Sequence, residues 1–286
     1  MKYSLLIFLA ILSASSFGSI FHDDDRLEFH QMSKERQAVS ESSIALIPKS
    51  KLKKVGNKYK IVTKNLKDYL NFCPDSNFSN QLQAANCSGI LVKNQYLLTA
   101  AHCIDESMKG YGMNDFYAVF NYKKMAQNQN EYFINKEDVF ELVKKTHYEF
   151  DKTFSSTLLD LAIFKLDRKP NYKSAKVSFK KMNKGDRVYV LGYPLGIALK
   201  LSDDSVVTKT VGRKNSFQHQ LDTFSVNSGS PIFDEESNVV GVHVRGTGFN
   251  YKEYGRSCKD WYKGEATRDY GEANDIRSLK NIYDRL

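Results

Sequence analysis

Residues 96–103 read Tyr-Leu-Leu-Thr-Ala-Ala-His-Cys, an apolar run that ends in two alanines, a histidine and a cysteine. Four residues rich in aromatic and aliphatic side chains, followed by small ones, indicate a buried strand and the turn after it. The alanines let other backbone approach His102, and a disulfide at Cys103 would fix the turn. A histidine alone is more often structural than catalytic, so the role of His102 depends on whether the chain also supplies catalytic partners.

Short apolar stretches recur on both sides of this run, separated by glycine, asparagine, aspartate and proline. In the first half they lie at residues 44–47, 59–62, 89–92, 96–99, 116–122, 139–144 and 161–166. Beyond a basic connector they resume at residues 187–192, 206–211, 218–223, 231–233 and 239–244. This spacing is typical of an all-β chain. We therefore expect one β-barrel in residues 43–170 and a second in residues 171–286.

The two ends of the chain carry different patterns. Lys2 precedes an apolar run that is too short for a stable membrane anchor, and small residues follow it, so we expect a signal peptide at 1–19. Residues 20–42 are polar and mixed in charge, which predicts a propeptide, as in a zymogen, or a flexible arm. At the C-terminus, apolar residues spaced by three and four predict an amphipathic helix that begins near Asn274 or Asp275. Export implies a secreted or periplasmic protein.

The chain has four cysteines, an even number that favours disulfides in an exported protein. If 89–92 and 96–99 form a hairpin, Cys87 and Cys103 lie across it and can bridge. Cys73 and Cys258 are then left for each other. The sequence leaves the other two connectivities open.

The formal net charge is +9, with lysines scattered along the chain rather than gathered on one face. This pattern indicates a solvated surface, and no stacking platform or groove-reading motif accompanies it. We therefore expect no nucleic-acid partner, no membrane association after signal cleavage, and a monomer. The histidines show no metal-ligand spacing, so we expect neither a metal nor a cofactor.

Two further stretches carry reactive groups. Asp160 opens the run Asp-Leu-Ala-Ile-Phe-Lys-Leu, where a carboxylate at the mouth of an apolar strand needs donors if it is buried. Residues 227–231 read Asn-Ser-Gly-Ser-Pro, which presents Ser228 in a tight turn ahead of a strand. A serine attacks an amide efficiently only when a base takes its proton and an acid orients that base. His102, Asp160 and Ser228 supply these three groups.

Together, and in the order His, Asp, Ser, these stretches resemble the three signature boxes of trypsin-like serine peptidases. The resemblance spans residues 43–246 and implies the chymotrypsin-like fold of two six-stranded antiparallel β-barrels with a C-terminal helix. It implies that His102 is the general base and acid, that Asp160 orients it, and that Ser228 is the nucleophile. The substrates would be proteins or peptides.

Within that family, residues 227–231 and the Gly-Val-His of residues 241–243 are most similar to bacterial glutamyl endopeptidases, and a turn at 192–196 resembles one in those enzymes and in HtrA-type proteases. We expect a secreted serine endopeptidase that works through an acyl-enzyme and prefers Glu before the scissile bond. Two alternatives stay open. One is cleavage after Lys or Arg, and the other is a weakly active or inactive pseudoprotease that acts as a binding module.

The resemblance also implies an oxyanion hole built from the backbone N–H groups of Ser228 and Val226. In the family the second position is normally glycine. A β-branched residue resists positive φ angles, so this departure predicts a hole that is misformed in the resting enzyme.

Four residues bear on specificity, and they favour different substrate side chains. Asp222 lies where trypsin carries the aspartate that binds Lys or Arg. Thr223 and His243 resemble the residues with which glutamyl endopeptidases hold a carboxylate, and Arg245 adds positive charge nearby. We expect His243 to face the substrate and Asp222 to face elsewhere, since a direct pair would neutralise both.

Overall fold

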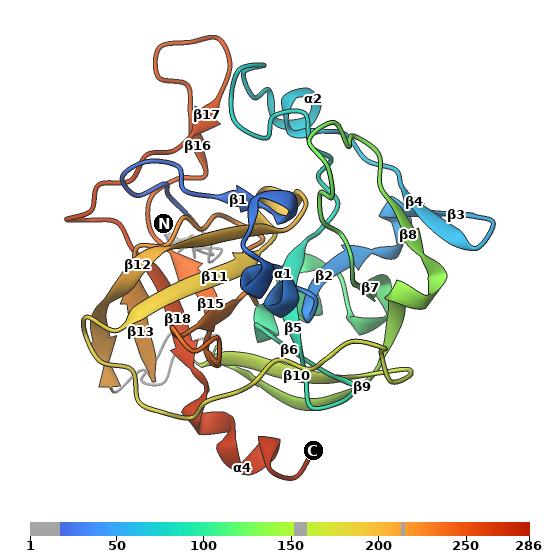
Figure 1. Cartoon of the computed structure of the whole chain (residues 1–286), viewed down its shortest axis with the longest axis vertical. Coiled ribbons are helices and arrows are strands. Elements are labelled where there is room, and N and C mark those ends of the chain that lie inside the picture. The colour runs from blue at the N-terminus through green and yellow to red at the C-terminus, as the bar shows by residue number, and fades with distance from the viewer. Residues whose placement is uncertain (1–17, 152–158, 213–214) are drawn as a thin grey trace, which may run out of the picture.

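The computed structural model describes residues 18–151, 159–212 and 215–286 (Figure 1). Most of the predicted signal peptide lies outside the described residues. The chain forms two closed six-stranded antiparallel barrels side by side, which confirms the predicted fold class. The strands of the first barrel lie between Ser43 and Leu166, and those of the second lie between Arg187 and Asp275.

The first barrel has the strand order β10-β6-β5-β2-β7-β9. Its strands are β2 (Ser43–Pro48), β5 (Cys87–Val92), β6 (Tyr96–Thr99), β7 (Phe116–Val119), β9 (Val139–Phe150) and β10 (Asp160–Leu166). All residues of β2 and β5 are buried, so apolar residues follow one another in these strands instead of alternating with polar ones. Strand β6 pairs with both β5 and β10, which brings the ends of the predicted His and Asp segments together.

The second barrel has the order β12-β11-β14-β15-β18-β13 and is closed by pairing of β12 with β13. Its strands are β11 (Arg187–Gly192), β12 (Lys200–Val211), β13 (Ser216–His219), β14 (Pro231–Phe233), β15 (Val239–Gly246) and β18 (Gly271–Asp275). A separate core of Val188, Val207, Phe217 and Ile232 fills it. The turn that carries Ser228 connects β13 to β14, at the side of this barrel that faces the first.

Smaller elements decorate the barrels. A three-stranded sheet consists of β3 (Leu52–Val55), β4 (Lys58–Ile61) and β8 (Phe133–Asn135). A two-stranded sheet consists of β16 (Tyr251–Lys252) and β17 (Asp260–Trp261). The helical turns are η1 (Phe29–Gln31), α1 (Lys34–Ser40), η2 (Lys49–Lys51), α2 (Leu66–Leu70), η3 (Ala101–Ile104), α3 (Glu106–Lys109), η4 (Met113–Asp115), η5 (Lys136–Asp138), η6 (Pro194–Gly196), η8 (Ile276–Leu279) and α4 (Lys280–Tyr283). The run at 59–62 therefore belongs to a side sheet rather than to the barrel, because its partners are β3 and β8.

The segment 20–42 differs from the flexible arm that its polar composition suggests. Strand β1 (Leu27–Glu28) adds to the edge of β12, and Ile20 and Phe21 are buried. Ser33 caps α1 by accepting a hydrogen bond from the Arg36 N–H. The segment is thus packed onto the second barrel, where it covers a strand edge that would otherwise be exposed.

The C-terminus is helical but shorter than expected. Residues up to Asp275 belong to β18, and Asp275 then caps the turn η8 by accepting from the Arg277 N–H. Helix α4 lies against the first barrel, where Lys93 donates to the Tyr283 carbonyl. Among the described residues, no helix has the length and apolar character that crossing a membrane requires.

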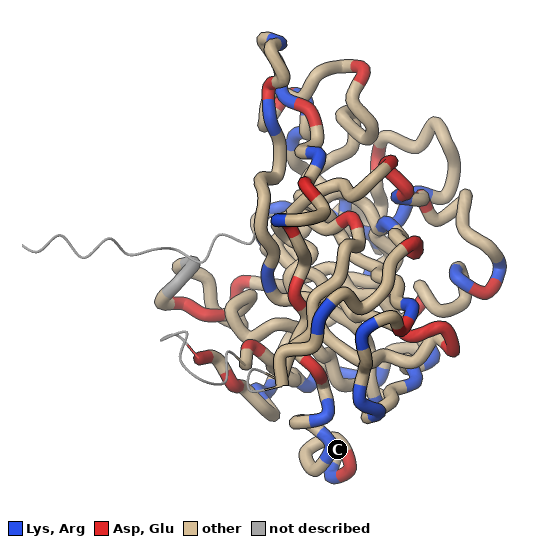
Figure 2. Tube along the Cα trace, turned by 90° about the vertical axis from the view of Figure 1, so that its left-hand side faces the viewer, with Lys and Arg blue, Asp and Glu red and all other residues tan. Residues whose placement is uncertain are grey.

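The structure contains the disulfides Cys87–Cys103 and Cys73–Cys258. The first joins the start of β5 to the turn η3. The second ties the loop after α2 to the hairpin of β16 and β17. In Figure 2 the positions of Lys and Arg alternate along the trace with those of Asp and Glu, and neither charge is confined to one part of the described chain.

Candidate active site

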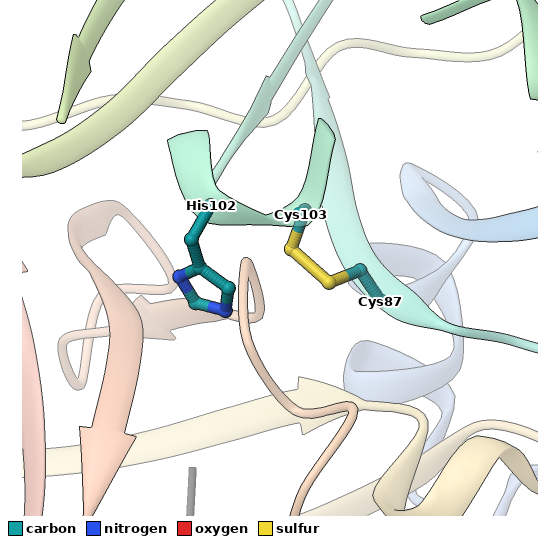
Figure 3. A group of neighbouring side chains, drawn as sticks. All are labelled: Cys87, His102 and Cys103. Atoms are coloured by element: carbon teal, nitrogen blue, oxygen red, sulfur yellow. A yellow bond between two sulfur atoms is a disulfide. The ribbon is translucent and has the colours of Figure 1, made fainter. Parts of the chain in front are cut away.

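His102 lies on η3, the single turn of helix that follows strand β6. The neighbouring Cys103 joins this turn to the start of β5 through its disulfide with Cys87 (Figure 3). The potential ligand atoms of these three residues lie within 4.8 Å of one another. Metal binding by cysteine needs thiolates, and both sulfurs are bonded to each other. The cysteines therefore fix the turn that presents the histidine.

Asp160 opens β10, beside the end of β6, and is only 4% exposed. One carboxylate oxygen accepts from the His102 backbone N–H at 2.8 Å, and the other lies 2.5 Å from His102 Nδ1. The backbone N–H of Asp160 donates to the Asn274 side chain of the second barrel at 2.8 Å. Two hydrogen bonds to one residue hold the imidazole in a single orientation, with its proton on Nδ1.

Ser228 lies in a turn that forms backbone hydrogen bonds with strands of both barrels. Its carbonyl accepts from the Ser88 N–H of β5 at 2.8 Å, and the next N–H, of Gly229, donates to the His243 carbonyl of β15 at 2.8 Å. Gly229 has a φ of 87°, and a Cβ there would lie 2.1 Å from the Ser88 carbonyl oxygen. Only glycine fits this close approach. The Ser228 carbonyl oxygen also lies 3.6 Å from Cys103 Sγ, which places Ser228 beside the turn that carries His102.

Val226, two residues before Ser228, has a φ of 76°. The sequence predicts that a β-branched residue resists this conformation, yet both flanking peptides are fixed in it. The Leu195 N–H donates to the Ser225 carbonyl at 2.8 Å, and the Ser88 hydroxyl donates to the Val226 carbonyl at 2.8 Å. Such strain persists only where surrounding bonds over-determine it.

The orientation of these peptides decides where the Val226 N–H points. In a trans peptide the N–H lies opposite the preceding carbonyl, so the Val226 N–H points away from Leu195. Within the described ranges, no backbone hydrogen bond uses the Val226 N–H, which lies two residues before Ser228.

Removal of the Ser88 hydroxyl tests whether its hydrogen bond to the Val226 carbonyl holds Val226 at positive φ. We expect Ser88→Ala to lower kcat about tenfold, since the strained Val226 peptide can then rotate and weaken an oxyanion donor. Glycine occupies positive φ without strain, so in a Val226→Gly background the same change costs less than about threefold. The measurement is kcat for the four proteins of this cycle, with thermal unfolding as the folding control. Equal losses in both backgrounds would show that Ser88 does not act through Val226.

A buried histidine pair lies behind the Ser228 turn. His219 Nε2 lies 3.2 Å from His243 Nδ1, and the Leu221 N–H donates to His219 Nδ1 at 3.2 Å. Burial lowers the pKa of His219 to about 3. Burial, and then the charges of His219, His102 and Arg245, lower the pKa of His243 well below its usual value. Both rings are therefore neutral at pH 7.

The hydrogen bonds of this pair assign its protons. Because His219 Nδ1 accepts from Leu221, the His219 proton sits on Nε2 and is donated to His243 Nδ1. The His243 proton is then on Nε2, a buried atom with no hydrogen-bond partner among the described residues. His243 is recognisable as a candidate from the sequence, whereas His219 is not. The two rings meet because Gly271, on the strand between them, has no side chain, and a Cβ there would lie 2.3 Å from the His219 ring.

Asp222 faces away from this pair. Its carboxylate accepts from the Phe21 N–H at 2.7 Å and from the Asp25 N–H at 3.3 Å. Burial raises the pKa of Asp222 to about 8, despite the opposing charge of Arg26. The structure thus places Asp222 against residues 21–25.

The other two predicted specificity residues differ in their surroundings. Thr223 is buried, and its carbonyl accepts from the Ser19 N–H at 2.9 Å. Arg245 lies 3.0 Å from Glu272, a buried carboxylate. This ion pair compensates the positive charge that the sequence suggested would steer acidic substrates.

Comparison with known proteins agrees with this arrangement. Residues 87–242, more than half of the chain, match the family model of the trypsin-like peptidase domain. A solved structure, described as a Glu endopeptidase in complex with MPD, aligns with a TM-score of 0.53 at 16% identity. The alignment covers 93% of this chain and 97% of that chain, and at this identity it shows a common fold. No curated protein matches the chain.

Proposed function

The chain belongs to the family of trypsin-like peptidases and is a serine endopeptidase, and on that premise we propose that Ser228 is its nucleophile, His102 its general base and Asp160 the group that orients His102. The observation that carries this assignment is the double hydrogen bond from His102 to the Asp160 carboxylate. It leaves Nε2 of the imidazole free to accept a proton, on the turn that touches the Ser228 segment.

The reaction proceeds in two halves. His102 takes the Ser228 hydroxyl proton while the oxygen attacks the substrate carbonyl, and the imidazolium then gives that proton to the leaving amine. Water, activated by the same histidine, releases the acid from the acyl-enzyme. Asp160 stays ionised and stabilises the imidazolium. The N–H groups of Val226 and Ser228 bind the oxyanion, and each such donor is worth on the order of 3 kcal/mol.

The preferred substrate residue before the scissile bond is Glu. His243 supports this preference, because its Nε2–H is a buried donor without a partner within the described ranges, and its backbone pairs with the residues just after Ser228. Cleavage after Lys or Arg would require an available carboxylate. Asp222 instead accepts two backbone N–H groups, and its raised pKa of about 8 keeps it largely neutral at pH 7.

A matched peptide set tests this specificity. We expect kcat/KM to be highest for Glu among peptides that differ only in carrying Glu, Gln, Leu or Arg before the scissile bond. His243→Ala should lower the value for Glu about thirtyfold, since a hydrogen bond to a charged group is worth about 2 kcal/mol, and should leave Leu cleavage much less affected. His147→Ala is the matched control, because His147 lies on β9 beside Glu149.

The opposite result is equally clear. If cleavage were fastest after Arg and were lost in Asp222→Ser, Asp222 would be the residue that binds the substrate side chain, and the preference for Glu would be refuted. His243→Gln separates a specific loss from a packing defect, because the amide restores an N–H donor and should recover part of the Glu cleavage.

Export completes the proposal. The two disulfides favour an oxidising compartment. We place the enzyme outside the cytoplasm as a monomer that acts on proteins or peptides. The pseudoprotease alternative depended on a misformed oxyanion hole, and the positive φ of Val226 gives that alternative no support.

A further inference from the structure

The three-stranded sheet of β3, β4 and β8 has two different faces. Side chains alternate along each strand, and residues directly opposite one another in an antiparallel pair share a face. On one face, Ile61 and Ile134 are buried in the main core. Tyr59, on the same face, packs against Tyr117 of β7 with ring centroids 5.8 Å apart. This face therefore attaches the sheet to the first barrel.

The opposite face, here named the lysine face, consists of Lys53, Val55, Lys58, Lys60 and Phe133. The strand register places Lys53 opposite Lys60, Val55 opposite Lys58, and Lys60 opposite Phe133. Lys53 and Lys58 are exposed, and the apolar Val55 and Phe133 are 46% and 44% exposed. The hairpin of β3 and β4 stands out at the edge of the molecule (Figure 1). The lysine face thus presents ammonium groups and apolar side chains together.

The positive charges of the lysine face are only partly compensated. Residues 49–60 contain six lysines and no acidic residue. Among the described residues, Lys60 forms an ion pair with Glu131, whereas no ion pair involves Lys53 or Lys58. Like charges directly opposite one another in a sheet are destabilising. The placement of Lys53 opposite Lys60 therefore costs stability, and Glu131 offsets only part of that cost.

Protection of an exposed strand edge explains only the lysines of β3. Strand β3 lies at the edge of its sheet, and lysines on an edge strand hinder pairing with a second copy. Lys58 and Lys60 lie on β4, which has a partner strand on both sides. A partner with negative charges would relieve the repulsion among these lysines.

We propose that the lysine face is a docking site for an extended acidic segment of the protein substrate. The open edge of β3 can accept such a segment as an added strand, and its carboxylates then meet the lysines. Val55 and Phe133 would contact apolar atoms of the same segment, which favours a peptide over a polymer that offers charge alone. The inference rests on the proposed function, because proteins rich in Glu offer the bonds that this enzyme is proposed to cleave. Docking would raise the concentration of those bonds near the enzyme.

Fluorescence anisotropy with the full-length Ser228→Ala protein measures this binding without cleavage of the probe. The probe is a labelled dodecapeptide of alternating Asp and Leu, and the comparison peptide has Asn in place of Asp. We expect only the Asp peptide to bind, and more weakly as salt is added, because exposed charges are screened. Lys53→Glu combined with Lys58→Glu should weaken binding about thirtyfold, since each reversal replaces an attraction by a repulsion. Lys64→Glu combined with Lys67→Glu is the matched control: it makes the same charge change outside the lysine face and should weaken binding less than about threefold.

Thermal unfolding separates the loss of a binding site from a folding defect. Lys53→Glu alone replaces the like-charge pair with Lys60 by a pair of opposite charges. It should therefore raise the thermal midpoint by about 2 °C while it weakens binding of the Asp peptide. A folding defect would instead lower the midpoint.

Three results would overturn the lysine face as a docking site: equal affinity of the two double variants, equal binding of the Asp and Asn peptides, or tighter binding of a thymidine oligonucleotide than of the Asp peptide. Hydrolysis of a short Glu peptide keeps this test apart from the proposed function. Both double variants, made with Ser228 in place, should cleave that peptide at the wild-type rate. Absence of hydrolysis by the wild-type protein would overturn the proposed function and not the binding of the Asp peptide.

Discussion

Ser228→Ala is expected to abolish peptide hydrolysis, with kcat lower by about 10⁶-fold, because members of a catalytic triad act as a unit. The turn should survive, since its hydrogen bonds to Ser88 and His243 use backbone atoms only. Circular dichroism and thermal unfolding should therefore match the wild type. The measurement is single-turnover hydrolysis of a Glu-containing peptide.

A serine of the same turn provides the control. Ser230 is fully buried, and its hydroxyl accepts from Asn227 at 3.3 Å. Ser230→Ala should retain kcat within about fivefold, since one neutral hydrogen bond is worth about 1 kcal/mol. A Ser228→Ala protein that still cleaves at an appreciable rate, with trace contamination excluded, would refute the nucleophile assignment.

Asp160→Asn should give the second largest loss, about 10⁴-fold in kcat, with little change in stability. An amide keeps the shape of the carboxylate but can accept through only one atom, whereas His102 presents two N–H donors to it. The amide NH₂ group then faces His102 Nδ1 and favours the tautomer in which the imidazole proton is on Nε2. In that tautomer Nε2 cannot accept the proton of Ser228. Steady-state kinetics at several pH values measure this loss.

Asp105→Asn is the matched control for this change. Asp105 is also a buried aspartate, three residues after His102, and it accepts from the Tyr148 hydroxyl at 2.6 Å. Its neutralisation should lower kcat less than about tenfold, as expected for a hydrogen bond outside the reaction. Comparable losses in Asp105→Asn and Asp160→Asn would argue that Asp160 has only a structural role.

Local patterns were sufficient to predict the fold class and the principal candidates. Strands β5 and β10 are buried on both faces, so their sequences are nearly continuous apolar runs that mark strands without knowledge of the partners. The turns at His102 and Ser228 could be recognised because each combines a reactive side chain with small neighbours. The sequence therefore located the residues that the fold brings to the junction of the barrels.

The missed features all depend on contacts between distant residues. The Phe21 bond to Asp222 spans 201 positions, so residues 20–42 look like a loose polar arm until the second barrel is present. His219 meets His243 only because their strands flank β18, and that register is not visible in either stretch. Val226 shows the same limit, since local preference opposes a φ that Ser88 and Leu195 impose from other strands.

The most direct test of the catalytic assignment is covalent labelling of the folded protein with a fluorophosphonate, followed by mass spectrometric location of the adduct. Only a serine activated by a neighbouring base reacts readily with this probe. We expect one adduct per chain, on Ser228, with labelling lost in His102→Ala. An adduct on another residue, or labelling of Ser228 that is as fast in His102→Ala as in the wild type, would contradict the assignment.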